Sequence, residues 1–204
     1  METQKLIYIS LAAGILNLET IQAGQFLISR PSFAGFILGL ISGYPLICFF
    51  AGLLIEAIYL DYTPIGGAVP PNGVLACAVF AGLSFKAYEY FALCFFISLF
   101  SGFLYAAADR KIRTWKNMWN QFYLMEIEKG KFKPGLWVTL SLIVDFAALT
   151  SMSGFLISLF QKITPFLEKI DFLKNWTETA FLAVPFIALS SLYFRLTGQV
   201  RKNA

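Results

Sequence analysis

Three polar side chains that interrupt apolar sequence have the chemistry to bind an uncharged, hydroxyl-bearing ligand. Glu56 is the single charged residue of the apolar run 33–60. Asn72 lies near the end of a proline-rich and glycine-rich loop, and Gln25 lies in a polar stretch further upstream. A carboxylate accepts hydrogen bonds from hydroxyl groups, and an amide both donates and accepts them. This combination suits a neutral polyol such as a sugar, because these hydrogen bonds orient the ligand without requiring a charge on it.

The loop over residues 61–73 is stiff and yet leaves backbone groups accessible. Pro64, Pro70 and Pro71 restrict its conformation, whereas Gly66 and Gly67 carry no side chain that would keep a ligand from the main-chain N–H and C=O groups. We therefore expect Gly66 and Gly67 to contribute to binding, with Pro64 in support.

The composition places these residues in a membrane protein. The chain has 204 residues, of which 58% are hydrophobic and 14% are charged, and its mean hydropathy is +0.68. Soluble domains carry about 25% charged residues. A net charge of +4, with no basic stripe that alternates with aromatics, argues against a nucleic-acid partner.

Residue types also limit the chemistry. The chain has no histidine, so it offers no His metal ligand, no His general base and no Ser-His-Asp triad, and its three cysteines follow no metal-binding spacing. We expect no catalytic residue, no metal site and no cofactor.

The apolar runs predict an all-α polytopic integral membrane protein, a bundle of full and broken or re-entrant transmembrane helices. Runs 91–108, 136–160 and 180–194 are the longer candidates; 7–18 and 74–85 fall short of the roughly 20 residues that cross a bilayer as a helix. Gly43-Tyr44-Pro45 divides 33–60 into two elements. Broken helices around a central site are typical of transporters; the alternative is that these pieces are kinked spans.

Glycines at positions 35, 39 and 43 recur every four residues. This spacing puts them on one helix face, where they would let another backbone approach.

Lysine and arginine set the expected orientation. They are densest over residues 109–134, which we expect to form a basic cytoplasmic loop. Residues 161–179 would then lie outside and the C-terminal tail inside. The alternative interpretation of the basic segment is a docking surface for a soluble acidic partner.

Inside a membrane, each charged side chain needs an explanation. Glu56 is a functional candidate for that reason; the alternative is that Glu56 lies near the interface, because Asp61 and Tyr62 follow within two turns. Arg30 would bind a phosphate, pair with Glu19 or Glu56, or extend to the interface. Asp145 lies in a polar seam that hydrogen bonding between helices explains as readily as a substrate path does.

The stretch 24–72 resembles the signature region of subunit IIC of the mannose-type (mannose/fructose/sorbose family) sugar phosphotransferase system. Four sub-motifs occur in the family's order: a glutamine ahead of Ser-Arg-Pro (25–31), a glycine-spaced helix (35–43), a glutamate in an apolar helix (54–58), and a Pro-Ile-Gly turn that leads to Pro-Pro-Asn (64–72). Ala106 to Arg110, followed by basic sequence, also resembles the family's middle.

The resemblance implies a permease subunit of a phosphoenolpyruvate-dependent phosphotransferase system. It would bind a hexose near the bilayer midplane and release it inward for phosphorylation by partner subunits. Position by position, Gln25, Glu56 and Asn72 become the sugar contacts, supported by the backbone at Gly66 and Gly67.

The family's partners and location are implied in the same way. They are a IID-like membrane subunit, soluble IIA and IIB phosphocarrier proteins that supply the phospho-histidines, and membrane lipid, in an oligomeric complex of the bacterial cytoplasmic (inner) membrane. The subunit itself would be non-catalytic. We expect one membrane-embedded domain over 1–204, shortened toward its C-terminal end relative to the family. The alternative is a divergent, non-transporting paralogue that acts as a membrane scaffold or sensor.

Overall fold

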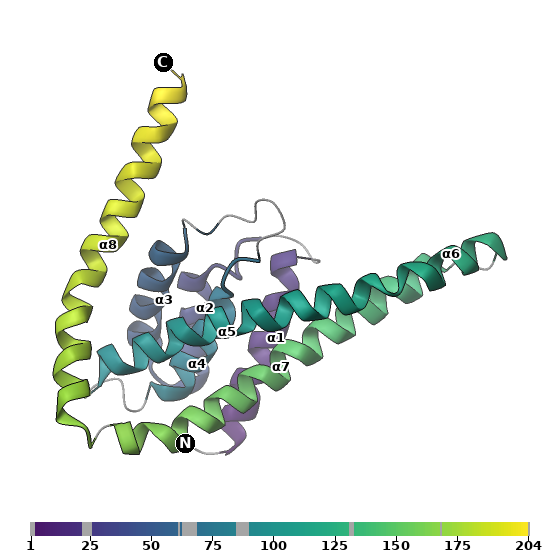
Figure 1. Cartoon of the computed structure of the whole chain (residues 1–204). Coiled ribbons are helices and arrows are strands. Elements are labelled where there is room, and N and C mark those ends of the chain that lie inside the picture. The colour runs from purple at the N-terminus through teal and green to yellow at the C-terminus, as the bar shows by residue number, and fades with distance from the viewer. Residues whose placement is uncertain are drawn as a thin grey trace.

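The computed structural model describes residues 3–21, 26–60, 62, 69–84, 90–130, 133–167 and 169–203, and their secondary structure is helical, without strands. The helices, in chain order, are α1 (Thr3–Ile21), α2 (Pro31–Ser42), α3 (Pro45–Tyr59), α4 (Gly73–Leu83), α5 (Phe91–Asn117), α6 (Asn120–Glu128), α7 (Pro134–Leu167) and α8 (Asp171–Asn203). This arrangement confirms the predicted all-α class (Figure 1).

Helices α2 and α3 form the predicted broken pair. α2 ends where Gly43 adopts a left-handed φ of 93°, and the Gly43 N–H donates to the Gly39 carbonyl at 2.9 Å. Pro45 starts α3, because its missing N–H is not needed in a first turn. A Cβ on Gly35 would lie 2.5 Å from the Cys48 carbonyl oxygen. Gly35 and Gly39 are therefore packing glycines, as predicted, whereas Gly43 is a turn glycine, with nothing within 4 Å of a Cβ placed there.

Helix α4 is the centre of the bundle. Every residue from Val74 to Leu83 is buried, and the helix contacts α1, α2, α3, α5 and α7. Such enclosure suits a short apolar helix, because its ends can lie at membrane depth only where protein or a water-filled cavity surrounds them.

The predicted basic loop over 109–134 is wrong. Helix α5 continues to Asn117, α6 follows, and together with the first part of α7 they form a long arm that projects from the bundle (Figure 1). No glycine or proline interrupts residues 103–129, so nothing in the local sequence stops the helix. Trp119 also packs against Trp115 and Trp137, with ring centroids 5.2 and 6.0 Å apart, which joins the two sides of the arm.

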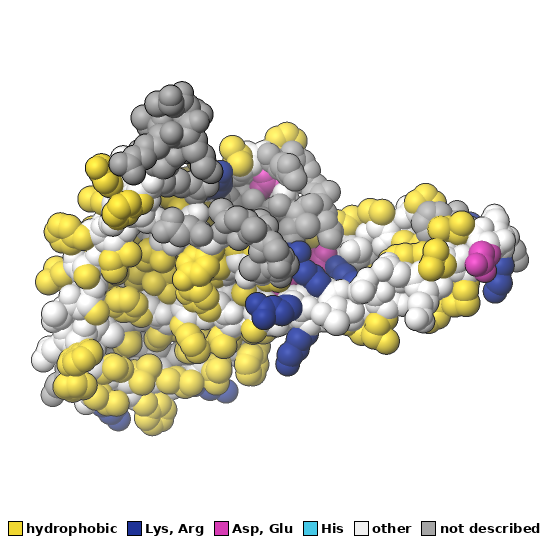
Figure 2. Space-filling view, turned by 45° about the horizontal axis from the view of Figure 1, so that its top comes forward, with side chains coloured by type: hydrophobic (Ala, Val, Ile, Leu, Met, Phe, Trp, Pro, Cys, Tyr) yellow, Lys and Arg dark blue, Asp and Glu magenta, His cyan; other side chains and the backbone are white. Residues whose placement is uncertain are grey.

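The bilayer-spanning candidates lie in the second half of the chain. Among the described residues, three segments are long and apolar enough to cross a membrane: Phe91–Glu128, Pro134–Leu167 and Phe172–Phe194. Hydrophobic side chains cover much of the outer surface in Figure 2, as expected of a surface that contacts lipid. α8 packs on α3 and α5, with Phe181 and Phe91 ring centroids 5.1 Å apart. The expected outer connection, 161–179, is largely the end of α7 and the start of α8.

Candidate functional site

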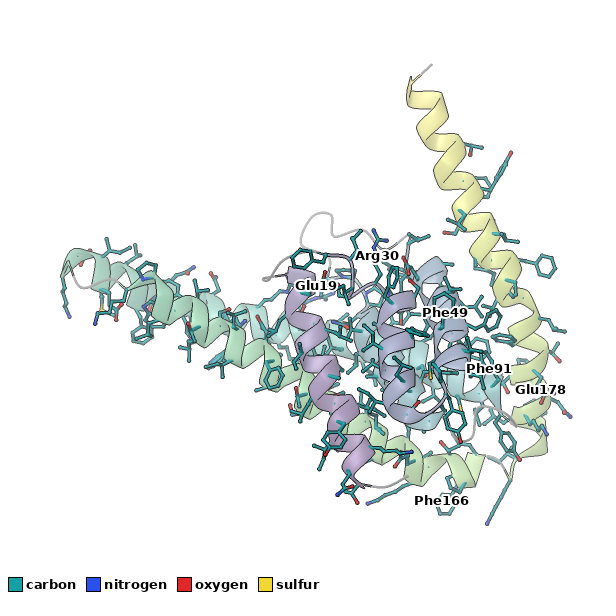
Figure 3. All side chains as sticks on the ribbon, turned by 180° about the vertical axis from the view of Figure 1, so that it is seen from behind. Glu19, Arg30, Phe49, Phe91, Phe166 and Glu178 are labelled. Atoms are coloured by element: carbon teal, nitrogen blue, oxygen red, sulfur yellow. The ribbon has the colours of Figure 1, made fainter. Side chains whose placement is uncertain are left out.

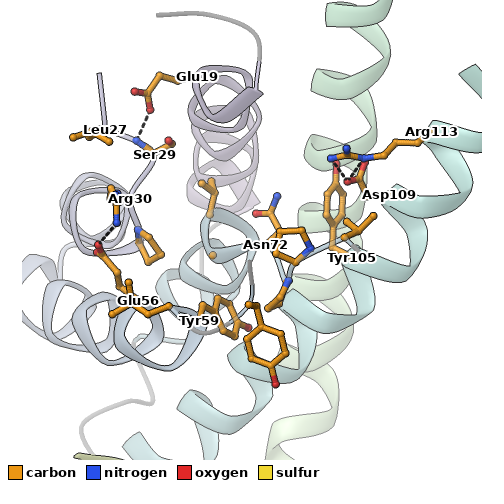
Figure 4. A pocket seen from close by; sticks show the side chains of 18 residues that line it. Glu19, Leu27, Ser29, Arg30, Glu56, Tyr59, Asn72, Tyr105, Asp109 and Arg113 are labelled. Carbon is orange, nitrogen blue, oxygen red and sulfur yellow. Dashed lines mark hydrogen bonds and ion pairs between the residues drawn. The ribbon is translucent and has the colours of Figure 1, made fainter. Parts of the chain in front are cut away.

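A cavity of about 710 Å³ lies at the end of the bundle where α1 and α3 end and α2 and α4 begin, with the middle of α5 as its far wall (Figure 4). Polar and aromatic side chains from all five helices and the segments beside them line it: Glu19, Ser29, Arg30, Glu56, Tyr59, Tyr62, Asn72, Tyr105, Asp109 and Arg113. This volume is within the range of small-molecule sites, about 300–1,000 Å³.

Glu56 forms one side of the cavity and is held by the start of α2. Its Oε1 accepts from Arg30 Nη1 at 3.2 Å, and its Oε2 accepts from the Ser32 backbone N–H at 3.2 Å and the Ser32 hydroxyl at 2.6 Å. Of the alternatives for Arg30, pairing with Glu56 is the one found. Two donors saturate Oε2, so the remaining acceptor capacity of the carboxylate is on Oε1.

Asn72 joins three helices. Its Oδ1 caps α4 by accepting from the Leu75 N–H at 2.8 Å, and its Nδ2 donates to Asn17 Oδ1 at 2.8 Å. Its backbone N–H donates to the Gly102 carbonyl in α5 at 3.2 Å. Asn17 is only 3% exposed and also interacts with the Tyr105 hydroxyl. The Asn72 side chain is thus fixed in orientation, and it keeps one N–H for another partner.

The segment between α1 and α2 is held by Glu19, which lies at the same end of the bundle as Arg30 (Figure 3). Glu19 accepts from the backbone N–H groups of Ile28 at 3.2 Å and Ser29 at 2.5 Å. Leu27, which lines the cavity, has a left-handed φ of 68°, a conformation that costs a non-glycine residue about 1–3 kcal/mol. The bonds to Glu19 hold this turn in place.

The α5 wall carries Tyr105, Asp109 and Arg113 at four-residue spacing, which places them on one helix face. Arg113 Nε donates to Asp109 Oδ2 at 2.9 Å, and Arg113 Nη2 forms an ion pair with the same oxygen at 2.9 Å. The Asp109 side chain is 13% exposed, whereas that of Arg113 is 53% exposed. None of the three was predicted as a site residue from the sequence. The available signal was an acidic residue directly after an apolar run, four residues before an arginine.

The family model EII-Sor, described as the PTS system sorbose-specific IIC component, matches residues 3–186. The chain belongs to this family. It is thus a multi-pass membrane protein and a sugar permease subunit of a phosphotransferase system, as the resemblance implied. Comparison with curated proteins found no significant match.

The structure brings together part of the site predicted for this IIC subunit. Glu56, Asn72 and Arg30 line one cavity. Gln25, Pro64, Gly66 and Gly67 lie outside the described residues.

Asp145 does not line the cavity of the IIC subunit. It pairs with Lys116, whose Nζ also donates to the Ser141 carbonyl at 3.3 Å and hydroxyl at 3.0 Å. The polar seam around Asp145 therefore fastens α7 to α5 at the base of the arm. Over the described residues, no group of three or more acidic or cysteine side chains is placed to hold a metal ion.

Proposed function

We propose that this IIC subunit binds a hexose in the cavity, near the bilayer midplane, and releases it inward for phosphorylation by partner subunits. One observation carries the proposal: Glu56 and Asn72, which are far apart in the sequence, line one cavity of about 710 Å³. Gln25 and the Gly66-Gly67 backbone belong to the same proposed site. Helices of 11–15 residues, such as α3 and α4, extend only about 17–23 Å at 1.5 Å per residue. The cavity at their ends is therefore compatible with a position inside the hydrocarbon layer, which is about 30 Å thick.

The hydrogen-bonding capacity left in the cavity suits a neutral sugar. Glu56 Oε1 accepts from a sugar hydroxyl in addition to Arg30, and the free N–H of Asn72 donates to a sugar oxygen. The Arg30–Glu56 pair at 3.2 Å balances the carboxylate charge, so the ligand needs no charge of its own. Four aromatic or apolar residues of the cavity, Tyr59, Tyr62, Tyr105 and Val69, offer surfaces for the apolar face of a sugar ring.

The proposed complex contains a IID-like membrane subunit and soluble IIA and IIB phosphocarriers, in the inner membrane of a bacterium. The exposed apolar side chains of the arm, such as Phe122 at 55% and Leu124 at 61%, are compatible with a membrane partner or lipid. A pull-down from native membranes tests this assembly, and the absence of a IID-like protein from it contradicts the assembly.

The proposed site is tested by uptake of labelled sorbose, mannose and fructose in cells that carry the partner subunits. We expect Glu56→Gln to weaken uptake about 10- to 100-fold, because it removes a charge-assisted hydrogen bond. Asn72→Ser keeps a capping oxygen but loses the amide, and we expect a loss of about 2- to 12-fold. Glu126→Gln is the matched control: it is the same acid-to-amide change, on a side chain that accepts from Trp137 Nε1 at 2.8 Å in the arm and does not line the cavity.

Unchanged uptake in both cavity variants would remove the site assignment. Sugar binding without any uptake in the wild type would instead favour the scaffold or sensor function.

A further inference from the structure

We propose that Asp109 is a second sugar-hydroxyl acceptor, on the wall of the cavity opposite Glu56, and that Arg113 positions it. This inference rests on the proposed function, because it adds a specificity-determining contact to the same site. It assigns a role to α5, the longest of the described helices that line the cavity.

The Asp109 carboxylate is engaged by Arg113 through one oxygen. Arg113 Nε donates to Oδ2 at 2.9 Å, and Arg113 Nη2 forms an ion pair with the same Oδ2 at 2.9 Å. Within the described part of the chain, no hydrogen bond to Oδ1 is formed. The side chain is 13% exposed and lines the cavity. Burial removes most of the water around this carboxylate, and one of its oxygens accepts no hydrogen bond from the described residues. Such an oxygen strongly favours a hydroxyl group as a hydrogen-bond donor.

The Asp109 wall resembles the Glu56 wall. On each side an arginine pairs with a carboxylate, and on each side one carboxylate oxygen has acceptor capacity left: Oε1 of Glu56 and Oδ1 of Asp109. In the view of Figure 4, the Arg30–Glu56 and Arg113–Asp109 pairs lie on opposite sides, with Asn72 between them. A hexose carries hydroxyls around its whole ring, so two facing acceptors would engage different hydroxyls of one molecule.

The burial of Asp109 separates this pair from an ordinary helix-surface ion pair. Arg113 and Asp109 are four residues apart, a spacing that is common for solvent-exposed pairs of little energetic effect. In such a pair both side chains reach water. Here the acid is 13% exposed and the base 53%. The arginine screens the acid from one side and leaves its other oxygen to the cavity.

The test uses the full chain in membrane vesicles that contain its partner subunits. Equilibrium binding of labelled sorbose, mannose and fructose identifies the tightest ligand, and its singly deoxygenated derivatives are then measured. The variants are Asp109→Asn, Glu56→Gln and, as the matched control, Glu126→Gln. Thermal unfolding of each variant establishes that it is folded.

We expect Asp109→Asn to weaken binding of the tightest sugar about 10- to 100-fold, with no change for Glu126→Gln. One deoxy derivative should be insensitive to Asp109→Asn, because the hydroxyl that the acid accepts from is already missing. A different derivative should be insensitive to Glu56→Gln.

Three results overturn the inference. If the wild type binds sugar and Asp109→Asn binds it equally well, Asp109 is not a contact, and the proposed function stands. If Asp109→Asn weakens all deoxy derivatives to the same extent, its effect is structural. If the wild type binds none of the three sugars, the proposed function fails, and this inference fails with it.

Discussion

Asn72 has a structural role that can be separated from its proposed contact with sugar. Asn72→Ala removes the cap of α4, which costs about 1 kcal/mol. It also leaves Asn17 Oδ1, in a side chain only 3% exposed, without its 2.8 Å donor, which costs about 1–3 kcal/mol. The free energy of unfolding should therefore fall by about 2–4 kcal/mol. At about 2–4 °C per kcal/mol for a chain of this size, Tm should fall by roughly 4–16 °C.

Two comparisons resolve that sum into its parts. Asn72→Ser keeps an oxygen that can accept from the Leu75 N–H, so we expect it to retain the capping contribution and to be more stable than Asn72→Ala. Asn17→Ala combined with Asn72→Ala removes the Asn17 Oδ1 atom that would otherwise be buried without a donor. The double variant should therefore lose less stability than the sum of the single variants, by about 0.5–3 kcal/mol.

Thermal unfolding of the full chain in detergent, followed by tryptophan fluorescence, measures these differences. If Asn72→Ser and Asn72→Ala melt at the same temperature, the capping argument is wrong. If the Asn17 and Asn72 effects are additive, the hydrogen bond between the two amides contributes nothing.

Three further outcomes test the packing, the arm and the orientation. Gly35→Ala places a Cβ 2.5 Å from the Cys48 carbonyl oxygen, so α2 and α3 must separate; we expect a loss of about 1–3 kcal/mol, and an unchanged Tm would contradict the close approach. Lys116→Met removes the cation beside Asp145, and Lys116→Met/Asp145→Leu removes both charges. The single variant should lose about 3 kcal/mol and the double variant less, as measured by Tm; equal losses would mean that the pair is not coupled. Lys129→Cys, at the tip of the arm, should react with a membrane-impermeant maleimide from the cytoplasmic side, because Lys129 is exposed while the three native cysteines are buried; labelling only from outside inverts the orientation.

Helix boundaries that depend on local backbone chemistry could be predicted from the sequence. Gly43 and Pro45 end and start helices by backbone geometry alone, so the division of the run 33–60 could be predicted. The arm could not be predicted in the same way. The absence of glycine and proline over 103–129 permits a helix there, but basic residues are equally compatible with a loop and with a solvated helix. Contacts such as the packing of Trp119 on Trp137 and the pairing of Lys116 with Asp145 distinguish the two.

The residues of the site also divide into those that could be predicted from the sequence and those that could not. Glu56 and Asn72 were recognisable because each is a polar residue in or beside an apolar run. Asn17 and Asp109 were not recognised, because their roles depend on which helices lie opposite them. Asn17 is one amide in an apolar helix until Asn72 is placed 2.8 Å away. Asp109 has the sequence environment of a helix-surface ion pair until the short helices α2–α4 surround it with a cavity.

Helix α5 is unbroken from Phe91 to Asn117. The part of α5 that lines the cavity and the part that belongs to the arm are therefore one rigid helix. Asp109 and Asn117 are about 12 Å apart along this rod, at 1.5 Å per residue. A change in the tilt of α5 would therefore move Tyr105 and Asp109 together, while Glu56 stays bonded to α2 through Ser32. We expect the distance between Asp109 and Glu56 to vary with the tilt of the arm.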